Sequence, residues 1–247
     1  MPSAWFPVDR PPVTVQALPA AAAVTALAAD IATRLTDAIA QRGSAVLSVS
    51  GGKSPIALFE SLRTHPLAWH KVHVTLVDER CVPNDHPDSN ARLVRDHLLQ
   101  GLARSAHFHP MVPDGVPPLP SPAAIATMAD STLLTVGEAD VLVLGMGADG
   151  HTASLFPQAP NLAEALATNC DHRCLAIALA HPPANAPYPR ITQTLAQLLR
   201  ARHIVLALTG ADKLATLQQA WAAKTDRLPI SHVLHQTMTP VALWISL

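Results

Sequence analysis

The stretch "VLVLGMGADGHTASLFP", residues 141–157, carries the strongest structural signal of this 247-residue sequence. It begins with an apolar run, Val141–Leu144, which is typical of a buried parallel strand. Three glycines follow at the spacing G-x-G-x-x-G, namely Gly145, Gly147 and Gly150. Because this spacing after a strand is that of dinucleotide-binding loops, the stretch poses a choice between a nicotinamide-dependent enzyme and a loop that serves other chemistry.

The residues beyond the loop argue against a dinucleotide. Such a site needs an acidic residue at the end of the next strand, where it binds the ribose. The next predicted strand, residues 174–179, ends instead in Ala180-His181-Pro182. Pro157 and Pro160 also cut short the long helix that a dinucleotide site needs after its loop. The glycines are therefore interpreted as a tight turn, and no nicotinamide cofactor is expected.

Outward from this loop, short apolar runs alternate with helical patterns along the chain. The alternation predicts an α/β fold, a Rossmann-like and mostly parallel sheet with helices on both faces. Strands are expected at residues 45–49, 72–77, 141–144, 174–179, 204–208 and 241–245. Helices are expected at residues 18–41, 54–63, 89–99, 122–134, 191–199 and 212–222. We expect a single domain over residues 1–247, and the pattern leaves open a small subdomain inserted around residues 90–135.

Composition narrows the function classes. Hydrophobic residues make up 49% of the chain and charged residues 14%, which is typical of a well-buried globular protein. The net charge of −1 gives no broad basic surface for nucleic acid or for anionic lipid. The alanine-rich segment 18–29 is too short to span a membrane. Three cysteines favour a reduced, cytoplasmic setting over a disulfide framework, and Cys170, His172 and Cys174 lack a second ligand pair, so no metal is expected.

Ligands of such sheets collect beyond the carboxyl ends of the strands. The residues that follow the predicted strands include Ser50-Gly51-Gly52-Lys53-Ser54, Asp78-Glu79-Arg80, Gly145 to His151, His181, and Lys213 a little farther on. The first of these loops has two glycines and opens a helix, a combination that suits a phosphate. Lys53 does not make it a P-loop, because the glycine which that motif requires is replaced by Leu47.

The sharpest chemical signal is His151, directly after the third glycine. Asp149, two residues earlier, can orient the imidazole and favour its protonated form, as the partner of a general base does. Asp78 and Glu79 suit either proton chemistry or a strand-end ion pair with Arg80, and the residues leave both readings open.

Two further cations follow later in the chain. Arg190 stands at the start of a predicted helix and Lys213 one turn into another. Each either completes an anion pocket or is an exposed helix charge.

Taken in order, these motifs resemble those of the glucosamine-6-phosphate isomerase/6-phosphogluconolactonase family, and within it the lactonases. The resemblance covers residues 43 to 247. The motifs that carry it are Ser50-Gly51-Gly52-x-Ser54-Pro55, Asp78-Glu79-Arg80, Ser89-Asn90, Gly145 to Pro157, Pro189-Arg190-Ile191-Thr192, Gly210-x-x-Lys213 and Pro229-Ile230-Ser231. It implies a Rossmann-like fold of the NagB/RpiA type, with no metal and no nucleotide cofactor.

The resemblance also implies a reaction, the hydrolysis of 6-phospho-D-glucono-1,5-lactone in the oxidative pentose phosphate pathway. The partner is then a small phosphorylated sugar lactone, with no nucleic acid and no membrane, and the enzyme is a cytoplasmic monomer or small homo-oligomer. His151 acts as general base and Asp149 as its partner. The residues expected to hold the substrate or its phosphate are Ser50, Gly51, Gly52, Lys53, Asp78, Arg80, Gly147, Arg190 and Lys213.

Two alternatives share the fold. A glucosamine-6-phosphate deaminase needs a glutamate where this chain has Phe156, and an aromatic ring cannot transfer a proton. A non-catalytic sugar-phosphate sensor binds the ligand without turnover.

Overall fold

A seven-stranded sheet forms the centre of the molecule. The computed structural model describes residues 5–115, 118–179, 187–210 and 213–246. Within these ranges the strand order is β1-β10-β9-β6-β2-β3-β5, and each neighbouring pair is parallel. In that order the strands are Val13–Leu18, Val241–Ser246, Ile204–Thr209, Val141–Leu144, Ala45–Val49, Val72–Leu76 and His107–His109. The predicted Rossmann-like α/β fold is confirmed.

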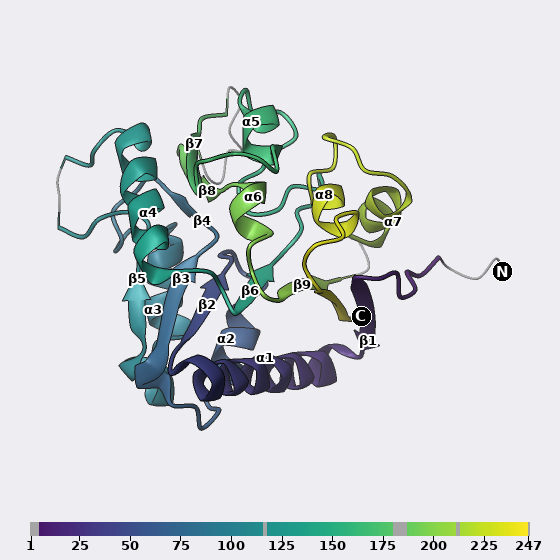
Figure 1. Ribbon diagram of the computed structural model, residues 1–247, viewed down its shortest axis with the longest axis horizontal. Coiled ribbons are helices and arrows are strands. Elements are labelled where there is room, and N and C mark those ends of the chain that lie inside the picture. The colour runs from purple at the N-terminus through teal and green to yellow at the C-terminus, as the bar shows by residue number, and fades with distance from the viewer. Residues whose placement is uncertain (1–4, 116–117, 180–186, 211–212, 247) are drawn as a thin grey trace.

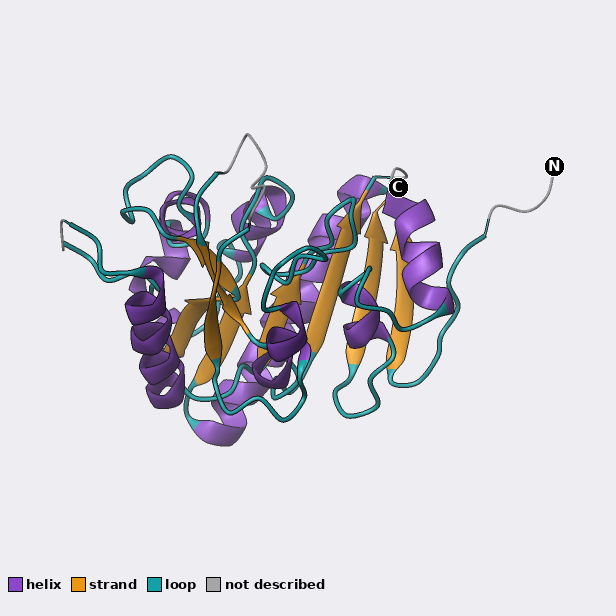
Figure 2. Ribbon diagram, turned by 90° about the horizontal axis from the view of Figure 1, so that it is seen from above, coloured by secondary structure: helices purple, strands orange, loops and turns teal. Residues whose placement is uncertain are grey.

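Helices cover both faces of this sheet (Figures 1 and 2). Figure 1 shows α1 and α2 on one side and α6 and α8 on the other. The helices are α1 (Ala20–Arg42), α2 (Ile56–Leu62), α3 (Asn90–His97), α4 (Pro122–Val136), α5 (Leu162–Leu166), α6 (Leu195–Leu198), α7 (Leu214–Ala222) and α8 (Ile230–Leu234), with short turns η1 (Trp69–Lys71) and η2 (Gly101–Ser105). Two hydrophobic clusters result: α1 and α2 belong to one, and α6 and α8 to the other.

The longest helix, α1, illustrates the local logic. Leu27, Ile31 and Leu35 are buried and stand four residues apart, so they form one apolar stripe against the sheet. The helix ends at Gly43, which has φ 83°, a left-handed conformation that glycine adopts without a Cβ penalty. Among the described residues, no helix is both long and apolar enough to cross a membrane.

A second, smaller sheet corrects three predictions. Its order is β4-β8-β7, with β4 at Asp78–Arg80, β8 at Arg190–Gln193 and β7 at Cys174–Ile177, and both pairings are antiparallel. The segment 78–80 was expected as a loop. The strand at 174–179 was expected in the main sheet. The helix predicted at 191–199 is a strand followed by the single turn α6, since Ile191 and Thr192 favour extended backbone.

Two strands of the main sheet were missed. β1 pairs with β10 at one edge, and β5 pairs with β3 at the other. β5 has only three residues, too few for a periodic pattern. It lies within the segment 90–135 and joins that segment to the main sheet, whereas α4 of the same segment packs against β7 and β8 of the small sheet.

Candidate functional site

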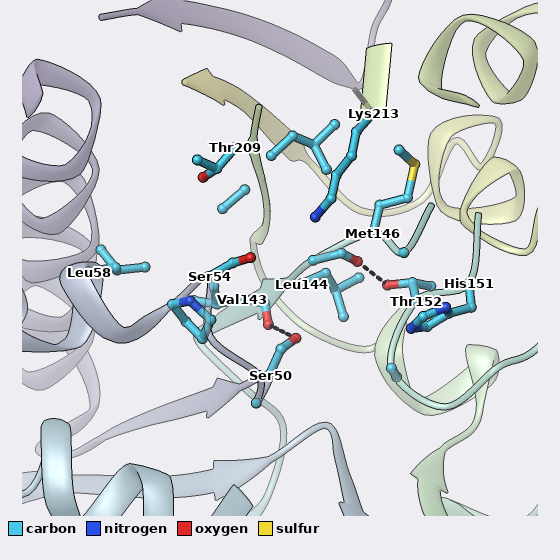
Figure 3. A pocket seen from close by; sticks show the side chains of 18 of the residues that line it. Ser50, Ser54, Leu58, Val143, Leu144, Met146, His151, Thr152, Thr209 and Lys213 are labelled. Atoms are coloured by element: carbon cyan, nitrogen blue, oxygen red, sulfur yellow. Dashed lines mark hydrogen bonds between the residues drawn. The ribbon is translucent and has the colours of Figure 1, made fainter. Parts of the chain in front are cut away.

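A cavity of about 560 Å³ opens at the carboxyl ends of β2, β6 and β9. Among the described residues, the predicted site residues that line it are Ser50, Gly51, Gly52, Asp78, Arg80, Gly147, Asp149, His151, Arg190 and Lys213. Lys53 is exposed and does not belong to the lining. Figure 3 shows Leu58 and His151 on opposite sides of the cavity, with the side chain of Lys213 extending between them from above.

The loop after β6 forms the tight turn that the glycines predicted. The N–H of Gly150 donates to the carbonyl of Gly147 at 3.0 Å, and Gly150 has φ 78°. The N–H of Gly147 donates to the carbonyl of His151 at 2.9 Å. A Cβ on Gly147 would lie 2.2 Å from Nδ1 and Cε1 of the His151 ring. Only a glycine at this position therefore leaves room for the imidazole.

Asp149 and His151 form a hydrogen-bonded pair. Oδ1 of the carboxylate lies 2.5 Å from Nδ1 of the imidazole, and it also accepts the His151 N–H at 3.1 Å. Burial raises the pKa of Asp149, but the hydrogen bond and charge of His151 outweigh it, so the net pKa is lowered. With Nδ1–H donated to a carboxylate, Nε2 is the nitrogen that can take a proton. The ring of Phe156 packs against the imidazole, with centroids 4.5 Å apart.

Two arginines stand together on the small sheet. Arg80 of β4 and Arg190 of β8 are cross-strand partners, and both line the cavity. Arg190 is buried. The pKa of Arg190 is lowered, mainly by burial and also by the charge of Arg80, while the charges of Asp78 and Glu79 partly oppose this shift. Since guanidinium stays charged in proteins, the pair is a strong attractor for an anion. The sequence predicted that Arg190 begins a helix, but in the structure Arg190 begins the strand β8.

The two acidic residues of β4 have different surroundings. Glu79 is fully buried and accepts hydrogen bonds from Ser89 Oγ and from the backbone N–H groups of Asn90 and Ala91, at 2.7–3.0 Å. Burial raises its pKa more than these bonds lower it. Glu79 therefore anchors the start of α3, outside the cavity lining. Asp78 lines the cavity and accepts a hydrogen bond from Ser154 Oγ at 2.6 Å.

The Ser50 loop is tied to the middle of the sheet. The Ser50 hydroxyl donates to the carbonyl of Val143 at 2.8 Å, and Gly52 adopts φ 85°. Lys213, predicted one turn into a helix, directly precedes α7. His181, which follows a predicted strand, lies outside the described residues.

The cavity also receives residues for which no role was predicted from the sequence, namely Ser54, Leu58, Asn90, Met146, Thr209 and Trp244. Ser54, Asn90 and Met146 stood within the quoted motifs. No local pattern marks Leu58 or Trp244 as site residues, because they come from elements far apart in the chain. The described residues hold no cluster of side chains suited to a metal ion.

Comparison with known proteins identifies the family of this chain. The sequence matches the family described as glucosamine-6-phosphate isomerases/6-phosphogluconolactonase over residues 19–244. The chain belongs to this family. A 6-phosphogluconolactonase of Mesorhizobium japonicum is 44% identical over 241 residues, which cover 97% of this chain and 92% of that protein. The resemblance inferred from the motifs is thereby confirmed.

Solved structures agree with the fold. A 6-phosphogluconolactonase from Shewanella baltica has a TM-score of 0.85 at 38% identity, covering 94% of this chain and 97% of its own. A monomeric glucosamine-6-phosphate deaminase of the NagB superfamily has a TM-score of 0.74 at 20% identity, covering 94% of this chain and 96% of its own. The second likeness concerns the fold alone, and it supports the predicted NagB-like architecture.

Proposed function

We propose that this protein is a 6-phosphogluconolactonase, which hydrolyses 6-phospho-D-glucono-1,5-lactone to 6-phosphogluconate in the pentose phosphate pathway. Membership of the family and the 44% identity to a named lactonase support the reaction. One structural observation carries the mechanism. The Asp149–His151 pair lines the same cavity as the glycine loop at Ser50 and the cations of Arg190 and Lys213.

The proton chemistry follows from the pair. Nε2 of His151 takes a proton from water as the oxygen attacks the lactone carbonyl, and a tetrahedral intermediate forms. The carbon–oxygen bond of the ring then breaks, and the proton returns to the departing ring oxygen. The product is an open-chain acid that ionises at neutral pH. Asp149 orients the ring and stabilises the imidazolium that appears during attack.

Binding of the phosphate would position the lactone. The loop Ser50-Gly51-Gly52 precedes α2, and the N–H of Ser50 already donates to the carbonyl of Val143. Gly51 and Gly52 are then the residues whose backbone N–H groups would contact the phosphate, while Arg190 and Lys213 supply charge. Held at that end, the ring places its carbonyl near His151, and this orientation lowers the barrier. Arg80 and the N–H groups of the 145–150 loop are the two candidates for stabilising the oxyanion.

Phe156 separates this proposal from deamination. The aromatic ring stands where the deaminase pattern has a glutamate, and it packs against the imidazole. This position therefore has no group that could transfer a proton to an opening sugar ring. A sensor that binds a sugar phosphate without turnover is the remaining rival.

Hydrolysis of freshly made 6-phosphoglucono-δ-lactone tests the proposal. Proton release in weak buffer reports turnover, and unphosphorylated gluconolactone runs alongside. Fast turnover of the phosphorylated lactone alone supports the reaction and the phosphate pocket together, and equal rates on both lactones discard the pocket. A rate no higher than the spontaneous one contradicts the reaction, and an ammonia assay then separates the deaminase from the sensor.

The setting of the enzyme is part of the proposal. Three free thiols, Cys81, Cys170 and Cys174, suit a reducing cytoplasm. We therefore propose a cytoplasmic location. We also propose a monomer or small homo-oligomer, because the described part of one chain supplies residues for both the base and the phosphate in one cavity. Size-exclusion chromatography with light scattering determines the oligomeric state.

A further inference from the structure

Asn90 lies at the start of α3, behind the glycine loop. Its side chain is 1% exposed, and its backbone N–H donates to the buried carboxylate of Glu79 at 2.8 Å. Its Nδ2 donates to the carbonyl of Asp78 at 2.9 Å. Because that carbonyl can only accept, the orientation of the amide is fixed, with nitrogen toward Asp78. The oxygen is then directed to the other side.

Gly51 lies beside the amide of Asn90, on the side of its oxygen. A Cβ built on Gly51 would lie 1.8 Å from Oδ1 of Asn90, 2.1 Å from Cγ and 2.5 Å from Nδ2. Gly51 is not among the glycines with positive φ, so its backbone conformation would accept an alanine. Glycine is needed at position 51 because the amide of Asn90 occupies the space of a side chain.

The amide oxygen of Asn90 is buried and has no hydrogen-bond partner among the described residues. Leaving a buried acceptor unpaired costs free energy. The contact with Gly51 does not pair this oxygen. The amide is held instead by its bond to the carbonyl of Asp78, and in that position it sets where the loop lies relative to β4.

We propose that Asn90 is a positioning residue for the phosphate of the substrate and that it acts through Gly51. This inference rests on the proposed function. The uncharged amide of Asn90 packs against Gly51 and holds the loop in place, so that the N–H groups of the loop stay directed at the anion. A carboxylate at this position would add to those of Asp78 and Glu79 and repel the phosphate.

The test compares N90A and N90D with a matched control, N84A. Asn84 is also buried, donates to the carbonyl of Val112 at 2.8 Å and has an Oδ1 without a partner in the described part of the chain, but it does not line the cavity. We expect N90A to lower kcat/KM for the phosphorylated lactone about tenfold or more, mainly through KM. N90D should lower it further. The rate on unphosphorylated gluconolactone should fall much less than the rate on the phosphorylated lactone in both, and N84A should leave the ratio of the two rates as in the wild type.

Equal losses on both lactones, or the same fall of the ratio in N84A, would overturn the proposal. Should N90A not fold, N90S, which keeps a short polar side chain without a charge, decides by the same ratio. Calorimetric titration with inorganic phosphate gives a second readout that needs no turnover, and weaker binding to the Asn90 variants is expected. Unchanged phosphate affinity contradicts the role of Asn90. A wild type that binds phosphate without hydrolysing the lactone instead contradicts the proposed function.

A double variant tests the contact itself. G51A should weaken binding of inorganic phosphate, because its methyl group displaces the loop from Asn90. In G51A/N90A the clash is gone, so this variant should bind phosphate more tightly than G51A alone. No recovery in the double variant would contradict a role exerted through Gly51.

Discussion

Oδ1 of Asp149 and Nδ1 of His151 lie 2.5 Å apart, and the imidazole has close neighbours although both side chains are partly exposed. Gly147 lies so close to the imidazole that no side chain fits there, and the ring of Phe156 packs against it. The imidazole is thus held in one orientation and one tautomer before any ligand arrives. This arrangement is what a general base requires.

Replacing His151, the proposed general base, should remove most of the catalysis. We expect H151A to lower kcat for the phosphorylated lactone by about 10²- to 10⁴-fold, the usual contribution of a positioned general base. Initial rates of proton release measure it, after subtraction of spontaneous hydrolysis. H172A is the matched control, because His172 is exposed and lies outside the cavity lining. Wild-type turnover by H151A would remove His151 from the mechanism.

Loss of the orienting carboxylate should cost less. In D149N the amide can still contact Nδ1 but no longer stabilises the imidazolium by charge. We expect kcat to fall by about 10- to 10²-fold, less than in H151A, because a residual base remains. KM should change little. A loss as large as that of H151A would show that Asp149 does more than orient the ring.

The pH dependence of thermal stability should report the interaction between Asp149 and His151. The pKa of Asp149 is lowered in the folded protein. The carboxylate therefore stabilises the fold above the ordinary aspartate pKa of about 3.9, and this contribution is lost as pH falls through the lowered value. We expect the Tm difference between wild type and D149N to shrink as pH falls through the lowered pKa of Asp149 and to vanish in strong acid. A difference that persists unchanged in strong acid would contradict the assignment.

The main sheet and the glycine loops were predictable from sequence because their signals are local. Continuous apolar runs mark buried parallel strands, and Gly51, Gly52 and Gly147 follow such runs directly. Position at the carboxyl end of a strand was then enough to gather most of the site. Lys53 differs from its neighbours in the loop, because they line the cavity whereas Lys53 is exposed outside the lining.

The small antiparallel sheet could not be predicted in this way. β4 has three residues and β8 has four, and each is defined by a partner about 110 positions away. The pairing of Arg80 with Arg190 and the contact of Asn90 with Gly51 arise only from this long-range packing. Glu79 could likewise not be separated from a catalytic acid until its hydrogen bonds to α3 were known.

The glycine at position 147 offers a test of the loop geometry. In G147A the new methyl group would lie 2.2 Å from the imidazole and force it aside. A displacement on the order of 1 Å can cost about 10²-fold in rate, so we expect a kcat loss of that size with folding retained. G145A is the control, because its methyl group meets open space. Equal rates of the two variants, with circular dichroism confirming the fold, would contradict the steric argument.

Variants of two lysines, Lys213 and Lys53, test whether the phosphate is bound by a specific contact or only attracted by positive charge. Lys213 lines the cavity, whereas Lys53 is exposed outside the lining. If Lys213 donates a charge-assisted hydrogen bond to the phosphate, K213M loses about 1.5–3 kcal/mol of binding, or roughly 10- to 150-fold in kcat/KM. K53M should keep the wild-type value, and neither variant should change the rate on unphosphorylated gluconolactone. Because both substitutions remove one positive charge, a comparable loss in K53M would mean that the phosphate responds to the overall positive charge and not to a specific contact with Lys213.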